Sequence, residues 1–122
     1  MRHLSHFDLL ANLRNGRSVE QLLSGRREGD VEVIRFLGID RDRDGRWTVR
    51  LYEVADVGTP DYLDLYSFPD VSEDPEDLPS ATFSSVEPAL EYACSALGAD
   101  LQRFVNQGVA ESEYIDAYHL QW

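Results

Sequence analysis

The sequence predicts one α+β domain over residues 1–122, with a small antiparallel β-meander of about three strands packed against N-terminal and C-terminal helices. A chain of 122 residues fits one hydrophobic core, and 43% hydrophobic residues can fill it. Apolar residues also change from helical spacing to strand alternation and back again, which is typical of the α+β class. The apolar runs are far shorter than the roughly 20 residues of a membrane span, so we expect no contact with a membrane.

The first elements are predicted to be two helices. Leu4, Phe7, Leu10 and Leu13 follow helical spacing, and the pair 15–16, Asn-Gly, is a helix stop. A second short helix is then expected over 18–25, because Ser18 reads as an N-cap, Gln21 as its capping-box partner and Gly25 as the end.

Three strands are predicted next, as a meander. Residues 31–39 are rich in β-branched and aromatic side chains of both parities, which indicates a strand covered on both faces. The pair 44–45, Asp-Gly, predicts a hairpin turn, and the alternation from Trp47 to Tyr52 predicts the return strand. After a turn at 58–61, residues 62–68 are expected to form the third strand.

The last third is predicted to be a loop followed by helices. Residues 69–79 contain three prolines and several acids but no arginine, which indicates an exposed acidic loop. Ser84 or Ser85 is expected to cap a helix whose apolar face runs to Leu97 and, after an interruption at Gly98, on to Gly108. A final helix is expected over 111–118.

Charge is distributed unevenly along the chain. The chain has 23 acidic and 11 basic residues, the latter all arginine, and its formal net charge is −12. Residues 1–50 carry +2, whereas residues 51–122 carry −14. Such an acidic field repels nucleic acid and anionic membranes and attracts basic proteins. Solubility alone is the other explanation of so many acids.

The motifs of common catalytic and metal sites are absent or incomplete. Asp40, Asp42 and Asp44 resemble the start of a calcium loop, but position 12 of that loop would be Leu51, so we expect a solvated hairpin tip. Cys94 lies near the apolar stripe of a helix, and we expect it to be buried and inert. His3, His6 and His119 are interpreted as surface histidines. We therefore expect no catalytic residues, no metal and no cofactor.

The N-terminus lacks the apolar stretch of a secretory signal, and the single cysteine excludes an internal disulfide, so a cytoplasmic location is expected. The alternation along the predicted strands puts four aromatic residues on one face of the sheet: Tyr52, Tyr62, Tyr66 and Phe68. This face is either covered by a helix or exposed as a protein-binding surface. The candidate partner-binding residues combine this aromatic face with the acidic loop: Tyr62, Asp64, Tyr66, Asp70, Glu73, Asp74, Glu76 and Asp77.

The segment 83–93, FSSVEPALEYA, and the following 105–108, VNQG, in an acidic α+β chain, resemble small bacterial immunity proteins of polymorphic and contact-dependent toxin systems. The resemblance implies a cytoplasmic protein that blocks a basic toxin, such as a nuclease effector, by direct binding. Two alternatives stay open: a nucleic-acid-mimicking adaptor for a basic protein, and a small enzyme that uses its acidic residues. The oligomeric state is left open.

Overall fold

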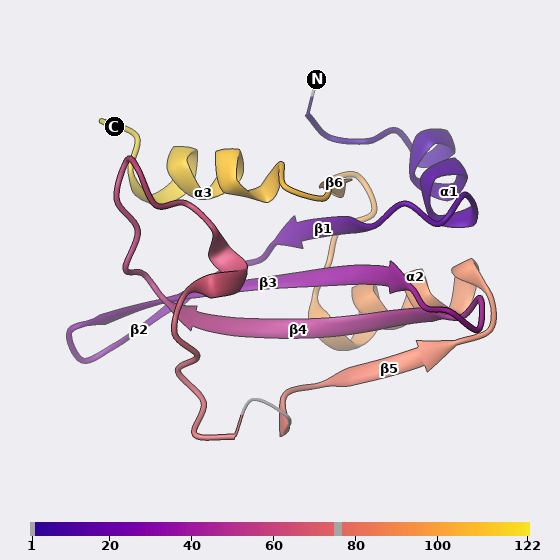
Figure 1. The fold of residues 1–122 in the computed structure, drawn as a ribbon, viewed down its shortest axis with the longest axis horizontal. Coiled ribbons are helices and arrows are strands. Elements are labelled where there is room, and N and C mark those ends of the chain that lie inside the picture. Colours follow the sequence, from indigo (N-terminus) through magenta and orange to yellow (C-terminus); the bar gives the residue numbers. More distant parts are fainter. Residues whose placement is uncertain (1, 75–76) are drawn as a thin grey trace.

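A computed structural model describes residues 2–74 and 77–122, and this part of the chain holds three helices and a six-stranded antiparallel sheet (Figure 1). The strand order is β5-β4-β3-β1-β6, and β2 also pairs with β3. The α+β class is thus confirmed, but the sheet has twice the expected number of strands.

The centre of the sheet is the predicted hairpin of β3 (Val31–Arg41) and β4 (Trp47–Ala55). Its turn is closed by the Asp42 carboxylate, which accepts hydrogen bonds from the backbone N–H groups of Asp44 and Arg46, both at 2.9 Å. Gly45 has φ of +79°, a left-handed conformation that explains the Asp-Gly pair. The hairpin forms as its local turn chemistry predicts.

The short helix expected over 18–25 is wrong, because this segment is strand β1 (Val19–Leu22), paired with β3 and β6. The Ser18 hydroxyl does not cap a helix but donates to the Asp40 carboxylate. Val19 and Glu20 are both buried, on opposite faces of the sheet. Pairing on both edges therefore outweighs a weak local helix signal. The chain then continues into β2 (Arg26–Glu28), which pairs with the start of β3.

The third strand expected over 62–68 is also wrong. This segment is a loop with one 3-10 turn, η1 (Leu65–Ser67), begun by the Asp64 carboxylate, which accepts from the Tyr66 N–H. The free edge of β4 is taken by β5 (Ser80–Phe83) instead. A hydrogen bond from a nearby backbone N–H to a side chain thus replaces the hydrogen bonds between strands at this segment.

The helices follow the apolar spacing where no glycine interrupts it. They are α1 (His6–Arg14), α2 (Val86–Leu97) and α3 (Ala110–Tyr118). The continuation expected from Gly98 to Gly108 is wrong, because Gly98 ends α2 in the left-handed conformation and the chain then extends into β6 (Val105–Asn106). No helix in the described residues is long and apolar enough to span a membrane.

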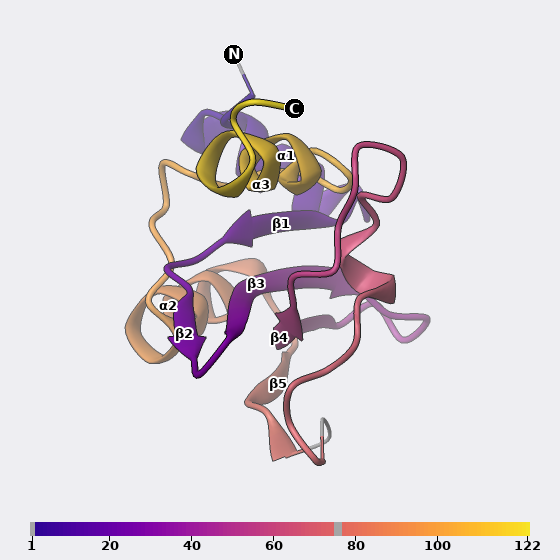
Figure 2. The same ribbon diagram turned by 90° about the vertical axis from the view of Figure 1, so that its left-hand side faces the viewer.

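The sheet is covered on both faces, as the two parities of β3 predict. Leu37 and Ile39 pack with α1 and α2 on one face, whereas Ile34 and Phe36 pack on the other with α3 and with Leu65 of the segment 56–70 (Figure 2). The Trp47 indole N–H donates to the backbone oxygen of Leu13 at 2.8 Å, which fixes α1 to the sheet. Segment 56–70 and α2 therefore lie on opposite sides of the sheet.

Candidate functional site

Segment 56–70 brings the predicted tyrosines to the surface over the α3 side of the sheet. Tyr66 packs edge-on against Phe36 and Tyr52, with ring centroids 5.0 and 5.1 Å apart. The Tyr62 hydroxyl lies 2.7 Å from the hydroxyl of Ser67. The sequence left open whether the aromatic face is covered by a helix or exposed as a protein-binding surface, and each alternative holds for part of it. Segment 56–70 and α3 together cover this face of the sheet, so Phe68 is buried against Tyr114 of α3, whereas Tyr62 and Tyr66 stay 38% and 42% exposed.

Glu20 is a buried carboxylate that fixes Tyr66 and the start of α3. It is 1% exposed, and one carboxylate oxygen accepts from the Tyr66 hydroxyl at 2.9 Å. The other accepts from the backbone N–H groups of Gly108 and Ala110, at 3.1 and 2.9 Å. Glu20 therefore supplies from β1 the cap that α3 lacks locally. Burial raises the pKa of Glu20, and the three donors oppose that rise.

A small cavity of about 160 Å³ lies where Tyr66 meets the start of α3. Its walls include Glu20, Asp64 and Glu111. Partial burial, and then the charges of Asp64 and Glu20, raise the pKa of Glu111. We call Tyr62, Asp64, Tyr66 and Glu111 the tyrosine face. Sequence reasoning placed the first three there and missed Glu111 and Glu20, which join them only through contacts distant in the chain.

The predicted acidic loop is only partly joined to the tyrosine face. Its start pairs with the sheet, since Asp70 forms a bridge with Val54, and the chain then descends to the β5 edge (Figure 1). Asp70, Glu73, Asp74 and Asp77 are exposed, whereas Glu76 lies outside the described residues. Within the described residues, no arginine forms an ion pair with Asp61, Asp64, Asp70, Glu73 or Asp77. Their charge is therefore available to a partner.

A second polar cluster ties the C-terminal residues to the start of segment 56–70. The Asp56 carboxylate accepts from the Tyr114 hydroxyl and lies 2.6 Å from Nε2 of His119. The His119 ring stacks on Trp122 with centroids 3.8 Å apart. His119 is thus a partly buried, paired residue instead of the isolated surface histidine that was expected. No sequence signal links Asp56 with His119, because they meet only in the fold.

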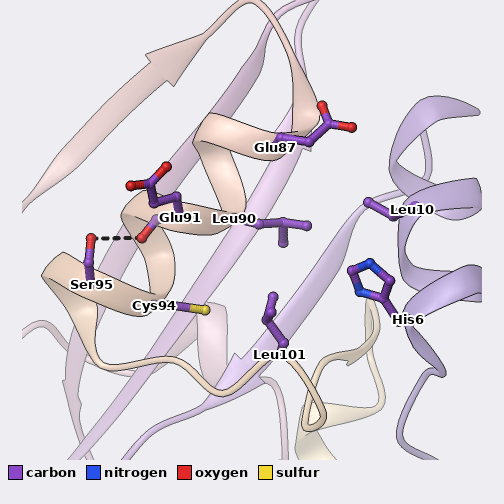
Figure 3. Close-up of a pocket in the computed structure, with 8 residues that line it drawn as sticks. All are labelled: His6, Leu10, Glu87, Leu90, Glu91, Cys94, Ser95 and Leu101. Atoms are coloured by element: carbon purple, nitrogen blue, oxygen red, sulfur yellow. Dashed lines mark hydrogen bonds between the residues drawn. The ribbon is translucent and has the colours of Figure 1, made fainter.

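A groove of about 520 Å³ lies between α1 and α2, on the opposite side of the sheet (Figure 3). Leu10, Leu90, Cys94 and Leu101 form its apolar walls, and His6 and Glu91 stand at its margin. Cys94 is partly exposed here, so the expectation that it is buried is wrong. Burial and then the charge of Asp100 raise its pKa, which disfavours the reactive thiolate.

Within the described residues, no three His, Cys, Asp or Glu side chains are arranged to hold a metal ion. His3, one of the histidines weighed as a ligand, pairs with Glu113 of α3 instead. Family models, curated proteins and solved structures were compared with the chain, and none matches.

Proposed function

We propose that this chain is a non-catalytic binding module for a basic protein, and that in its specific form it is a cytoplasmic inhibitor of a basic bacterial toxin. One observation carries the proposal: Tyr62 and Tyr66 are half-exposed beside carboxylates that no arginine of the described residues neutralises. The resemblance of segment 83–93 to immunity proteins supports the specific form.

Fixed aromatic side chains favour binding. Tyr62 and Tyr66 are both held by hydrogen bonds through their hydroxyl groups, so they lose little conformational freedom when a partner covers them. Tyrosine is enriched among the residues that dominate binding energy, and a charged margin sets the association rate and excludes acidic competitors. The tyrosine face therefore has the composition of a protein interface for a basic partner.

The cavity beside Tyr66 also gives an observation in favour of a small enzyme, because it gathers carboxylates whose pKa values are raised. Two features count against that function. A volume of about 160 Å³ is well below the roughly 300–1,000 Å³ of small-molecule sites. Both oxygens of Glu20 are already occupied by donors from Tyr66, Gly108 and Ala110, so this carboxylate is structural.

Affinity capture from the source cell tests the proposed function. The wild-type chain and a Tyr62→Ala, Asp64→Asn variant serve as matched baits, and bound proteins are identified by mass spectrometry. We expect the wild type to retain a protein with a basic isoelectric point at 1:1 stoichiometry and the variant to lose it. Val31→Ala is the control, because Val31 is 42% exposed but lies at the β2–β3 turn, outside both the tyrosine face and the groove between α1 and α2.

If the retained protein is a toxin, adding this chain abolishes its activity in a purified assay. If it is a nucleic-acid-handling protein without toxicity, competition by nucleic acid identifies the adaptor instead. Equal capture by the wild type and the tyrosine-face variant would contradict the proposed interface.

A further inference from the structure

The groove between α1 and α2 combines apolar walls with access from solvent. Leu90 and Leu10 come from facing helices, and Leu101 of the segment after α2 is 40% exposed at its side (Figure 3). Phe7 precedes Leu10 by three residues on α1, so it lies on the same side of that helix, and it is 79% exposed. Exposed apolar groups gathered around a hollow are typical of a binding surface.

The groove continues past Leu101 along the start of α1. A second cavity of about 740 Å³ shares His6 and Leu101 with the first and extends to His3 and Gln102. Together the two cavities form an open trough that is larger than the roughly 300–1,000 Å³ of a compact small-molecule site. A trough with apolar walls between two helices suits an amphipathic helix, which places side chains one turn apart into it.

The charged residues around the trough determine whether a positively or a negatively charged partner can bind there. Asp8, Glu91 and Asp100 are exposed at or beside its walls, and no ion pair joins them to an arginine within the described residues. Among the margin carboxylates of the described part of the chain, Glu87 alone has such a partner, since it lies 2.6 Å from Arg14. An occupant with lysine or arginine beside its apolar stripe would pair with these acids, whereas an acidic helix would be repelled.

We propose that the trough between α1 and α2 binds a basic amphipathic helix of a protein partner, with its apolar stripe against Leu10, Leu90 and Leu101 and its cations against Glu91, Asp8 and Asp100. This site lies across the sheet from the tyrosine face and does not depend on it. Cys94, the single cysteine of the chain, lies in the wall and reports on occupancy.

The test uses a fluorescein-labelled 15-residue peptide of leucine and lysine with leucines at helical spacing. Two control peptides are measured beside it. One has glutamate in place of lysine, and the other keeps the lysines but has its leucines dispersed around the helix. Anisotropy measures binding, and the alkylation rate of Cys94 by iodoacetamide shows whether the trough is covered. We expect the lysine amphipath to bind most tightly and to slow alkylation, and the glutamate peptide not to bind.

Two matched variants locate the peptide. Leu101→Arg should weaken binding about tenfold or more, since it removes an apolar wall and adds a repelling charge. Leu120→Arg adds the same charge at a residue that is 74% exposed outside the trough, and should leave binding nearly unchanged. Both positions are exposed, so circular dichroism should show that each variant folds.

Equal binding of the amphipathic and dispersed peptides, equal effects of the two arginine variants, or an unchanged alkylation rate would each overturn the inference. Binding lost in Tyr62→Ala but kept in Leu101→Arg would place the peptide on the tyrosine face. That result overturns the trough and leaves the proposed function standing.

Discussion

Glu20 is a buried acid whose charge state affects the stability of the fold. Its carboxylate is buried in the sheet and holds Tyr66 and the N-terminus of α3 together. Because burial raises its pKa, the folded chain binds its proton more tightly than the unfolded chain. The contribution of Glu20 to stability is therefore greatest below the unfolded pKa of about 4.3 and falls as pH rises through the folded value.

Replacing Glu20 tests this balance. Glu20→Gln keeps acceptors for Gly108 and Ala110 and removes the buried charge, so its stability relative to wild type should rise from pH 5 to pH 7. Glu20→Ala leaves buried donors without partners and should cost about 3 kcal/mol. Urea unfolding at both pH values measures both effects. If Gln instead lost stability relative to wild type as pH rises, the ionised carboxylate would be the stabilising form.

At the residue level, the sequence singled out Tyr62, Asp64 and Tyr66 because they share one face of the strand expected over 62–68, although that segment is a loop with a 3-10 turn. It could not predict Glu20 or Asp56, because their partners lie on other elements. Tyr66 reaches Glu20 and His119 reaches Asp56 only after the strands have paired. A single buried acid in a short polar-looking segment gives no pattern that marks its role.

Among the elements, β2, β3 and β4 are joined by one carboxylate. Glu53 of β4 accepts from Arg26 of β2 and from Arg35 of β3, both at 2.8 Å, and its side chain is 13% exposed. The Arg26 guanidinium, and also Arg35, hold the pKa of Glu53 below its usual range. A lowered folded pKa means that the stabilisation is present above the unfolded pKa and is lost as pH falls through the folded one.

Glu53→Gln should therefore lower the free energy of unfolding by about 1 kcal/mol at pH 7 and have almost no effect near pH 2. Glu28→Gln is the matched control. Glu28 also pairs with Arg26, but its side chain is 55% exposed, and the cost should be about 0.3 kcal/mol or less. Thermal unfolding at the two pH values measures both variants, and equal costs would show that Glu53 does not join the strands.

The elements that sequence predicted correctly are those whose signals are local. The hairpin 31–55 has its Asp-Gly turn, and α2 has its apolar stripe and terminal glycine. The errors at 18–25 and 62–68 arose where distant pairing or a side-chain bond decides the backbone. Strand β6 has only two residues, too few for any periodicity.

For the whole molecule, the uneven charge predicts how a partner approaches. Residues 51–122 carry −14, and Asp70 and Glu73 are exposed within them. Such a field can raise association rates about 10- to 1,000-fold at low ionic strength, and screening acts over about 8 Å at 0.15 M salt.

Once a basic partner is identified, Asp70→Asn with Glu73→Gln should slow its association and weaken the salt dependence while leaving dissociation nearly unchanged. Asp30→Asn with Asp44→Asn removes the same charge at two exposed turns of the 1–50 half and should slow association less. Stopped-flow binding at two salt concentrations compares the pairs. Identical rates for both pairs would show that net charge, and not its position, governs the encounter.

The order of strands in the sheet also sets an order of folding events. The β3–β4 hairpin closes over a short turn, whereas β1 meets β6 by joining Val19 to Asn106. That closure costs about 2 kcal/mol more chain entropy, so α3 and β6 should dock after the folding barrier is crossed. Glu20→Ala should then speed unfolding with little change in the refolding rate, while Val49→Ala in the hairpin slows refolding, as chevron plots can measure. Until α3 and β6 dock, the edge of β1 that pairs with β6 would therefore be unpaired. Because α3 docks last during folding, it would also be the first element to detach during unfolding.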